Sequence, residues 1–373
     1  MPNAPGTIRD TILTFLAERD GEASAAEIRR AVTDRMGEVP ASSVRSFLRL
    51  NANSRLEKVA RGRYRLREDE PDNITAVSLA PAIAEGRATL FHADCFAWLR
   101  DRAANSVHAV VTDPPYGVVE YSERELAKLR EGKGGGVWRV PPAFDGTKRS
   151  PLPRFTTLTV ADRTELSAFF RRLGTHLARV VVPGGNVVIA SNPLLCHLVA
   201  GALAEAGLEP RGYLARLTMT MRGGDRPKNA HEEFSDVSVM PRSQWEPWVV
   251  MRRPLEGRVQ DNLRKWGTGG FKRPSDERPF GDVIKSSPTT KMERTLAPHP
   301  SLKPQAFLRQ VVRAVLPRGT GVVLDPFAGS GSTLAAANAV GYDSIGVEAD
   351  PKFVRLAEGA IGKLAAIKII DPA

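Results

Sequence analysis

The feature of the sequence that most constrains the fold is a short apolar run, Val107–Val111, that leads into an acid and two prolines. Continuous apolar runs of this kind are typical of parallel strands that are buried on both faces. Pro114 and Pro115 have no backbone N–H to give to a neighbouring strand, so the strand is expected to end there in a stiff turn. Ligands of open α/β sheets bind at the carboxyl ends of such strands. The turn offers the carboxylate of Asp113, free carbonyl oxygens and the ring of Tyr116, which suits a planar group bearing an NH2, although ordinary strand exits share this composition.

A second stretch near the C-terminus has the pattern strand, glycine turn, helix and strand. The first strand ends at Asp325, the turn contains Gly329 and Gly331, and the helix continues to Val340. The second strand ends at Glu348, seventeen positions after Gly331, which is a suitable distance for an acid that reaches ribose hydroxyls. The third glycine of a dinucleotide fingerprint is absent, so the unit is expected to bind a nucleoside without phosphates.

Together the two motifs resemble those of amino-methylating DNA methyltransferases that use S-adenosylmethionine. Asp113-Pro114-Pro115-Tyr116 is similar to the catalytic motif of that family, and Asp325–Gly331 is similar to its cofactor motif. The catalytic motif comes first, as in the β group of these enzymes, and the similarity covers about residues 86–365. The resemblance implies an α/β chain with a Rossmann-like, S-adenosylmethionine-dependent methyltransferase fold whose strands follow a permuted order.

The resemblance also implies a role for each residue that matches a motif. Catalysis is assigned to Asp113, Pro114, Pro115 and Tyr116. The segment His299–Pro304 resembles a short motif that packs near the methionine end of the cofactor. Methyl transfer from a positive sulfur needs no metal, and no metal ligands are expected. The residues expected to bind S-adenosylmethionine are Asp94, Cys95, Asp113, Lys303, Asp325, Pro326, Phe327, Ala328, Gly329, Gly331, Glu348 and Ala349.

The predicted reaction is transfer of a methyl group to the exocyclic N6 of adenine in duplex DNA, with the base flipped out of the helix. Members of the family tend to carry Asp at the first motif position for adenine and Ser for cytosine, so Asp113 favours adenine. Methylation of cytosine at N4 stays open, because both bases present an amino group. A DNA-binding protein with a vestigial methyltransferase domain is the alternative from another class, and the intact motifs argue against it.

Residues 1–70 are expected to form a separate winged-helix-like domain for DNA binding or protein interaction. Apolar residues recur at helical spacing, Ser24 is placed to cap a second helix, and Ser42 or Ser43 is placed to cap a third. A basic two-stranded ribbon follows and turns at Arg61-Gly62. An interaction or dimerisation module uses the same scaffold. In the DNA-binding interpretation, the contacts come from Arg45, Arg49, Arg61 and Arg63.

The remaining boundaries follow from composition and from the order of the motifs. Residues 71–85 are polar and acidic, which suits a linker, while the catalytic half spans 86–252 and the cofactor half spans 299–373. A glycine-rich, basic insert at about 118–160 is interpreted as a loop over DNA. The segment 253–298 is rich in cations and matches the position of the target-recognition segment in β-group enzymes. Its expected DNA contacts are Arg264, Lys265, Lys272 and Arg273.

The composition favours a nucleic-acid partner. The chain of 373 residues carries a net charge of +11 and has a sequence pI of about 9.9, which favours a polyanion such as double-stranded DNA. Cys95 and Cys196 provide no disulfide framework. The first six residues have neither the charged nor the apolar region typical of a signal peptide, and no apolar run approaches membrane-spanning length. We therefore expect a cytoplasmic protein without a membrane partner. A homodimer and a cognate restriction or defence partner stay open.

Overall fold

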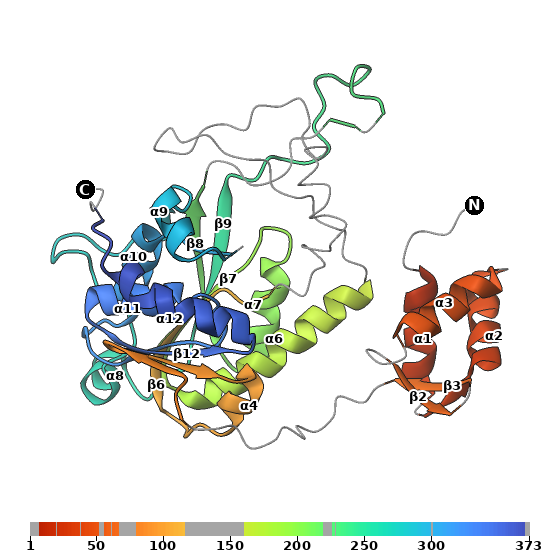
Figure 1. Cartoon of the computed structure of the whole chain (residues 1–373), viewed down its shortest axis with the longest axis horizontal. Coiled ribbons are helices and arrows are strands. Elements are labelled where there is room, and N and C mark those ends of the chain that lie inside the picture. The colour runs from red at the N-terminus through yellow and green to blue at the C-terminus, as the bar shows by residue number, and fades with distance from the viewer. Residues whose placement is uncertain are drawn as a thin grey trace. The chain divides into compact units, whose positions relative to one another are not determined.

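The structure is a computed structural model in which the chain divides into two compact units (Figure 1). The first includes Met1–Thr75, and the second, which includes Ala76–Thr156 and Glu165–Ala373, carries both sequence motifs. Tyr116, Arg61, the insert up to residue 159 and most of the predicted linker lie outside the described residues. The structure describes residues 7–19, 21–37, 39–51, 56–60, 62–66, 80–115, 160–218, 226–227, 229–299 and 301–369.

The described part of the N-terminal unit folds around a core of its own. Three helices and a three-stranded sheet bury side chains such as Ile12, Ile28 and Leu48. The strand order is β1-β3-β2, and β2 and β3 form the predicted ribbon. The winged-helix-like interpretation stays a prediction. The elements are α1 (Thr7–Glu18), β1 (Ala23–Ser24), α2 (Ala25–Met36), α3 (Ala41–Asn51), β2 (Leu56–Ala60) and β3 (Arg63–Leu66).

Two helix starts in this unit differ in how well the sequence predicts them. Ser24 caps α2 as expected, because its hydroxyl accepts from Glu27 N at 3.2 Å and the Glu27 carboxylate accepts from Ser24 N at 2.8 Å. This reciprocal pair is a capping box. The prediction for α3 is wrong, because the helix starts at Ala41 and both candidate serines lie inside its first turn. Pro40 precedes that start, and the fixed φ of proline is compatible with entry into a helix.

The second unit is built on one mixed sheet, in which nine strands lie within the described residues. Their order is β10-β8-β9-β7-β6-β11-β12-β5-β4. The neighbours β7, β6, β11, β12 and β5 are parallel, whereas β9 runs antiparallel between β7 and β8. The strands are β4 (Ile83–Glu85), β5 (Ala88–His92), β6 (Val107–Thr112), β7 (Val181–Ala190), β8 (Glu209–Leu217), β9 (Trp245–Arg252), β10 (Val283–Lys285), β11 (Val322–Asp325) and β12 (Asp343–Glu348).

The last two strands of the chain lie in the middle of this sheet. β11 is inserted between β6 and β12, with Leu324 beside Val110 on one side and beside Ile345 on the other. This order confirms the predicted Rossmann-like methyltransferase fold with permuted strands. Such a rearrangement keeps the packing of the sheet, because the ends of a domain often lie close together in space. β6 is buried along almost its whole length, as its apolar run predicts.

Helices cover the sheet on both faces (Figure 1). Phe307 of α10 packs against Trp248 of β9 with ring centroids 5.1 Å apart, and Phe96 of α4 meets Phe169 of α6 edge-on at 5.5 Å. No described helix is both long and apolar enough to cross a membrane. The helices of this unit are α4 (Cys95–Arg100), α6 (Val160–Val180), α7 (Cys196–Glu205), α8 (Val259–Trp266), α9 (Lys291–Leu296), α10 (Gln305–Val315), α11 (Ser332–Val340) and α12 (Pro351–Ala365).

The two edges of the sheet have different roles. We call the edge where β5, β6, β7, β11 and β12 end the carboxyl edge, and the opposite edge, where they begin, the amino edge. Near the amino edge, Pro183–Gly185 lie within β7 and accompany an irregularity in its pairing with β6. At the carboxyl edge, Oδ1 of Asn192 accepts from the amides of Leu194 and Leu195 at 3.0 and 3.1 Å, directly before α7.

Candidate active site

Both sequence motifs lie at the carboxyl edge, because their strands are neighbours. β6 pairs with β11, and Val110 lies beside Leu324. The hydroxyl of Thr112 donates to Oδ1 of Asp325 at 2.6 Å, although the two residues are 213 positions apart. Asp113 follows Thr112 directly, so the acid of the Asp-Pro-Pro-Tyr motif lies next to the acid that begins the glycine motif.

Asp325 is almost completely buried between these strands, with 3% of its surface exposed. Its Oδ1 also accepts from Phe327 N at 3.1 Å. Burial raises the pKa of Asp325 to about 6, with a smaller contribution from the charge of Asp113, while hydrogen bonds from Thr112, Thr333 and the Phe327 amide oppose the rise. The side chain therefore fastens the start of the glycine turn to β6, and Pro326, Phe327 and Ala328 follow it into that turn.

The glycine turn depends on its two glycines for both backbone conformation and packing. Gly329 and Gly331 have φ values of +51° and +79°, in the left-handed region that favours glycine. A Cβ atom on Gly329 would lie 3.1 Å from Nε2 of His299, and one on Gly331 would lie 2.5 Å from Cγ1 of Ile361 in α12. Atoms of His299 and Ile361 therefore already occupy the space that a side chain at Gly329 or Gly331 would need.

The acid at the end of β12 is tied to this turn. Glu348 accepts from Gly329 N and from Asp350 N, each at 2.8 Å. A carboxylate oxygen accepts more than one hydrogen bond, so these contacts are compatible with the predicted role toward ribose hydroxyls. On the neighbouring strand β5, Nε2 of His92 lies 3.1 Å from the Ala349 carbonyl oxygen, which brings the start of α4 to the same edge.

Asp94 and Cys95 stand at that helix start. Oδ1 of Asp94 accepts from Phe96 N and Ala97 N at 2.9 and 3.0 Å, so Asp94 caps α4. Cys95 is buried, and burial raises the pKa of its thiol far above neutrality. A thiol in that state is a poor nucleophile. The structure thus places both predicted residues at the carboxyl edge, directly after the segment of β5 that pairs with Glu348, and shows that one oxygen of Asp94 already accepts from the helix amides.

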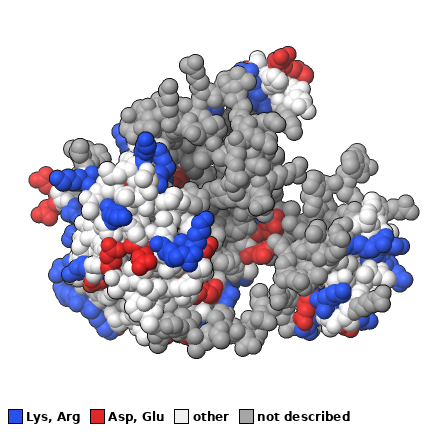
Figure 2. Space-filling model, viewed as in Figure 1, with Lys and Arg blue, Asp and Glu red and all other residues white. Residues whose placement is uncertain are grey.

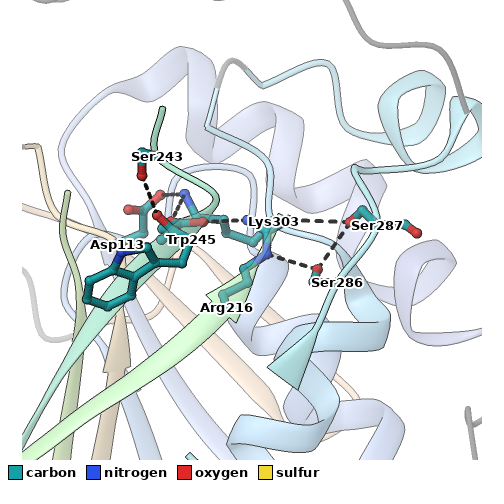
Figure 3. Close-up of polar contacts among 8 residues, drawn as sticks. Asp113, Arg216, Ser243, Trp245, Ser286, Ser287 and Lys303 are labelled. Atoms are coloured by element: carbon teal, nitrogen blue, oxygen red, sulfur yellow. Dashed lines mark hydrogen bonds and ion pairs between the residues drawn. The ribbon is translucent and has the colours of Figure 1, made fainter. Parts of the chain in front are cut away.

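Lys303, which the sequence assigns to the cofactor, lies against the catalytic motif (Figure 3). Its ammonium group forms an ion pair with Oδ2 of Asp113 and lies 3.4 Å from Oε1 of Glu246. Oε2 of Glu246 in turn accepts from Nη1 of Arg216 at 2.5 Å. The sequence analysis missed Glu246 and Arg216. The signal that could have found them is one ionisable residue within the apolar part of each strand, residues 213–217 of β8 and 245–251 of β9.

Other groups along the carboxyl edge fit a nucleoside cofactor. Oγ of Ser330, within the glycine turn, is buried without a hydrogen-bond partner in the described part of the chain. The same holds for Nδ2 of Asn192, directly after β7. Buried polar groups are nearly always paired in folded proteins, so these two favour a polar ligand at this edge. In the described ranges, no group of three or more His, Cys, Asp and Glu residues is placed to hold a metal ion.

The predicted target-recognition cations are not brought together with Asp113. Arg264 and Lys265 lie on α8, whose Asn262 donates to a carbonyl near the start of β7 at 2.9 Å, at the amino edge. The backbone N–H of Lys272 donates to the Ala314 carbonyl in the last turn of α10, and Arg273 is the next residue. Figure 2 shows Lys and Arg side chains over α8 at the lower left of the molecule. The contacts of these four residues with DNA stay a prediction.

The later part of the predicted target-recognition segment returns to the carboxyl edge. β10 runs parallel to β8, so the residues that follow β10 lie where β8 ends. Oγ of Ser286 accepts from Nε of Arg216 at 2.9 Å, and Oε1 of Glu293 in α9 accepts from Gln305 N at 2.7 Å. These contacts connect the segment to the buried ion pairs and to the start of α10.

The predicted DNA-binding cations of the N-terminal unit differ in their surroundings. Arg45 is exposed on α3, and its Nε donates to the Ala41 carbonyl at 3.3 Å. Arg63 forms an ion pair with Glu22 at 2.7 Å. Arg49 belongs to α3, but its side chain lies outside the described residues. Exposed ion pairs of this kind are weak and exchange readily, so Arg63 stays a candidate for phosphate contacts.

Comparison with known proteins identifies the family. Residues 107–359, more than half of the chain, match a family of DNA methylases. The chain belongs to this family. Type II methyltransferase M2.DpnII of Streptococcus pneumoniae is 34% identical to this methyltransferase over 282 residues, which cover 74% of this chain and 90% of that relative. Type II methyltransferase M2.LlaDCHI of Lactococcus lactis subsp. cremoris is 30% identical over 288 residues, with coverages of 76% and 92%.

Solved structures include the PvuII DNA methyltransferase, described as cytosine-N4-specific. It is 13% identical, covers 76% of this chain and 93% of its own, and has a TM-score of 0.47. Family membership confirms the predicted cofactor and general activity: this methyltransferase uses S-adenosyl-L-methionine to methylate an amino group in DNA.

Replacing Gly331 by alanine is expected to destabilise the methyltransferase unit with or without cofactor, because the new Cβ has to displace Ile361. Gly341 is a matched control, since its φ is +81° and a Cβ there would meet no atom within 4 Å. Both changes should lower the free energy of unfolding by about 1–2 kcal/mol through left-handed backbone. Only Gly331→Ala should lose a further 1–3 kcal/mol or so through overpacking. Equal losses in thermal unfolding of the two variants would contradict the contact with Ile361.

The raised pKa of Asp325 predicts a pH-dependent stability. The folded pKa, about 6, lies above the ordinary value of 3.8, so the folded state binds this proton more tightly than the unfolded chain. Ionisation of Asp325 therefore removes stability as the pH rises from about 4 to 6. Asp325→Asn keeps an acceptor for Thr112 but cannot ionise. As the pH rises from 4 to 7, its free energy of unfolding should therefore increase by about 2–3 kcal/mol relative to that of the wild type. Exposed Asp343→Asn is the control, and a pH-independent difference for Asp325→Asn in unfolding experiments would sink the prediction.

Proposed function

We propose that this methyltransferase transfers a methyl group from S-adenosyl-L-methionine to the exocyclic N6 of adenine at a specific site in duplex DNA. The main support is the carboxylate of Asp113. It follows β6 at the carboxyl edge, is ion-paired with Lys303 and stands beside Asp325, where the glycine turn begins. A fixed acceptor next to a cofactor turn is suited to hold an amino nitrogen in line with a methyl donor.

The residues of the loop have distinct proposed roles. S-adenosyl-L-methionine supplies a methyl group that its positive sulfur has already activated. The amino group of the base is a weak nucleophile, because its lone pair is delocalised into the ring. We assign its two N–H groups to the Asp113 carboxylate and the Pro114 carbonyl, and the charge that develops on the nitrogen is stabilised by Asp113. Stacking of the flipped base is assigned to Tyr116, after the stiff turn that Pro115 completes.

The choice of adenine rests on two arguments. Members of the family tend to carry Asp at the position of Asp113 when adenine is the target. A purine also offers more stacking area to Tyr116, and base stacking contributes about 1–3 kcal/mol. Cytosine N4 is the second candidate, because a carboxylate serves either amino group. A vestigial, non-catalytic domain is disfavoured, since Asp113 keeps its ion pair with Lys303 and the Gly329 amide keeps its hydrogen bond to Glu348.

The product of the reaction decides between these candidates. The protein is incubated with unmodified DNA and cofactor, and the digested nucleosides are identified by mass spectrometry. We expect N6-methyldeoxyadenosine. Asp113→Ala should lower the rate of transfer by at least about 100-fold, while the variant still binds DNA and cofactor. The exposed control Asp101→Ala should keep the wild-type rate. Methylated deoxycytidine alone would overturn the base assignment, and near-normal turnover of Asp113→Ala would overturn the role of that carboxylate.

The relatives support a wider role in restriction and modification. Both are named Type II methyltransferases, and we propose that this chain likewise protects DNA from a cognate restriction or defence partner. Long-read sequencing of methylated DNA tests this proposal, because a defined, fully modified site is required. A homodimer and a cytoplasmic location stay predictions, and light scattering of the purified protein measures the first.

We further propose that the N-terminal unit adds affinity for DNA through phosphate contacts. Deleting residues 1–75 should weaken DNA binding and flatten its salt dependence, because cations such as Arg45 are lost. Cofactor affinity should be unchanged, since the methyltransferase unit has its own core. Fluorescence anisotropy between about 50 and 200 mM salt measures the slope. Arg45→Ala should flatten it more than Arg35→Ala, and an unchanged slope after deletion would support the interaction-module interpretation.

A further inference from the structure

Four charged side chains alternate in sign along a buried row at the carboxyl edge (Figure 3). The row runs from Asp113 through Lys303 and Glu246 to Arg216. The exposed fraction of each side chain is 15% or less. An isolated charge at such a depth is strongly disfavoured, whereas here each ion has at least one neighbour of opposite sign. The row therefore has a defined order, in which removal of one member takes an opposite charge away from its neighbour.

The far end of the row is anchored in the sheet. Arg216 of β8 and Glu246 of β9 are directly opposite each other in the antiparallel pairing. The guanidinium of Arg216 also donates to Oγ of Ser286 at 2.9 Å and lies 5.2 Å from the ring centroid of Phe307. Strand pairing, a second hydrogen bond and an aromatic face together fix where the Glu246 carboxylate stands.

The chain on either side of Lys303 is held in place, in addition to its ammonium group. The residue stands two positions before α10, whose first residue, Gln305, is bonded through its amide to Glu293 at 2.7 Å. The side chain of Gln305 donates to the Ser332 carbonyl at 2.9 Å, at the start of α11. His299, at the beginning of this segment, lies against Gly329. The segment thus contacts the glycine turn with one end and Asp113 with the other.

The two inner ions of the row, Lys303 and Glu246, are each favoured in their charged form by their neighbours. Burial alone lowers the pKa of Lys303, but the negative charges of Asp113 and Glu246 outweigh it, and the net pKa is raised. Burial alone raises the pKa of Glu246, but Lys303 and Arg216 outweigh it, and the net pKa is lowered. Both directions follow from attraction between close, poorly hydrated charges.

We propose that Lys303 is a positioning residue for Asp113, held in place by Glu246 and Arg216, and that it contributes to the rate of methyl transfer through that carboxylate rather than by binding the cofactor. This assignment rests on the proposed catalytic role of Asp113. The ammonium group engages Oδ2 and so fixes the rotation of the carboxylate on a loop that two prolines already stiffen. A misplacement of about 1 Å in a reacting group lowers rates by about 100-fold, which sets the size of the expected effect.

The test compares variants in single-turnover methylation with saturating cofactor and DNA. Lys303→Met keeps the approximate length of the side chain without its charge, and Lys303→Arg keeps the charge. Glu246→Gln removes the negative charge on the other side of the Lys303 ammonium group. Lys363→Met, an exposed change on α12, is the control. Affinities for S-adenosyl-L-methionine and for DNA are measured separately by calorimetry and anisotropy, and thermal unfolding reports whether each variant folds.

We expect Lys303→Met to slow methyl transfer by about 100-fold, with cofactor and DNA affinities within threefold or so of wild type. Lys303→Arg should recover part of the rate, and Glu246→Gln should show a smaller loss than Lys303→Met. A wild-type rate for Lys303→Met, or a loss that arises only from weaker cofactor binding, would overturn the proposal. If Lys303→Met does not fold, the single-turnover rate of Glu246→Gln is the test. A wild-type rate for Glu246→Gln would be incompatible with the positioning role of Lys303.

Asp113→Ala, measured alongside, separates this proposal from the proposed function. Near-normal turnover of Asp113→Ala would remove the catalytic role of Asp113 itself. Loss of turnover in Asp113→Ala together with a wild-type rate for Lys303→Met would overturn only the positioning role of Lys303.

Discussion

The parallel pairing of β6 with β11 is the constraint on which the site depends. Two motifs that are far apart in the chain end at the same edge only because these strands are neighbours. The hydrogen bond from Thr112 to Asp325 then joins the two loops directly. Permutation of the chain leaves this pairing intact, because a strand neighbour is defined by packing rather than by order in the sequence. The catalytic role proposed for Asp113 follows from that geometry.

The carboxyl edge combines two carboxylates in different surroundings. Asp325 is buried among hydrogen-bond donors, and its raised pKa reflects the loss of water around it. Asp113 has a cation, Lys303, as a direct partner. Removing one partner of a buried ion pair is strongly destabilising, so such rows are sensitive to substitution. The ion pairs, the glycine turn and the strand ends are therefore connected to one another, and the proposed mechanism uses this connected group to hold a substrate base and a cofactor.

Local patterns in the sequence predicted the strand and the glycine turn, because each depends on residues close together in the chain. The permuted order was instead implied by the order of the two motifs and the family that they resemble. The partner of Lys303 could not be predicted in this way, since the contact joins positions 190 apart. The number of cations placed Arg264 and Lys265 in the predicted target-recognition segment. The composition of a segment does not show at which edge of the sheet it lies, and the structure places these two residues near the amino edge. The start of α3 was predicted wrongly, because Ser42 and Ser43, the expected caps, both lie inside the first turn of the helix.

We propose that the Asp113 loop binds the amino group of a flipped base beside the cofactor turn. A crystal structure of the methyltransferase with duplex DNA and a non-reactive analogue of S-adenosyl-L-methionine tests this proposal directly. We expect an adenine outside the duplex, with N6 about 3 Å from a carboxylate oxygen of Asp113 and from the Pro114 carbonyl oxygen. A base that remains stacked in the duplex, or an extruded base whose amino group contacts neither of these oxygens, would contradict it.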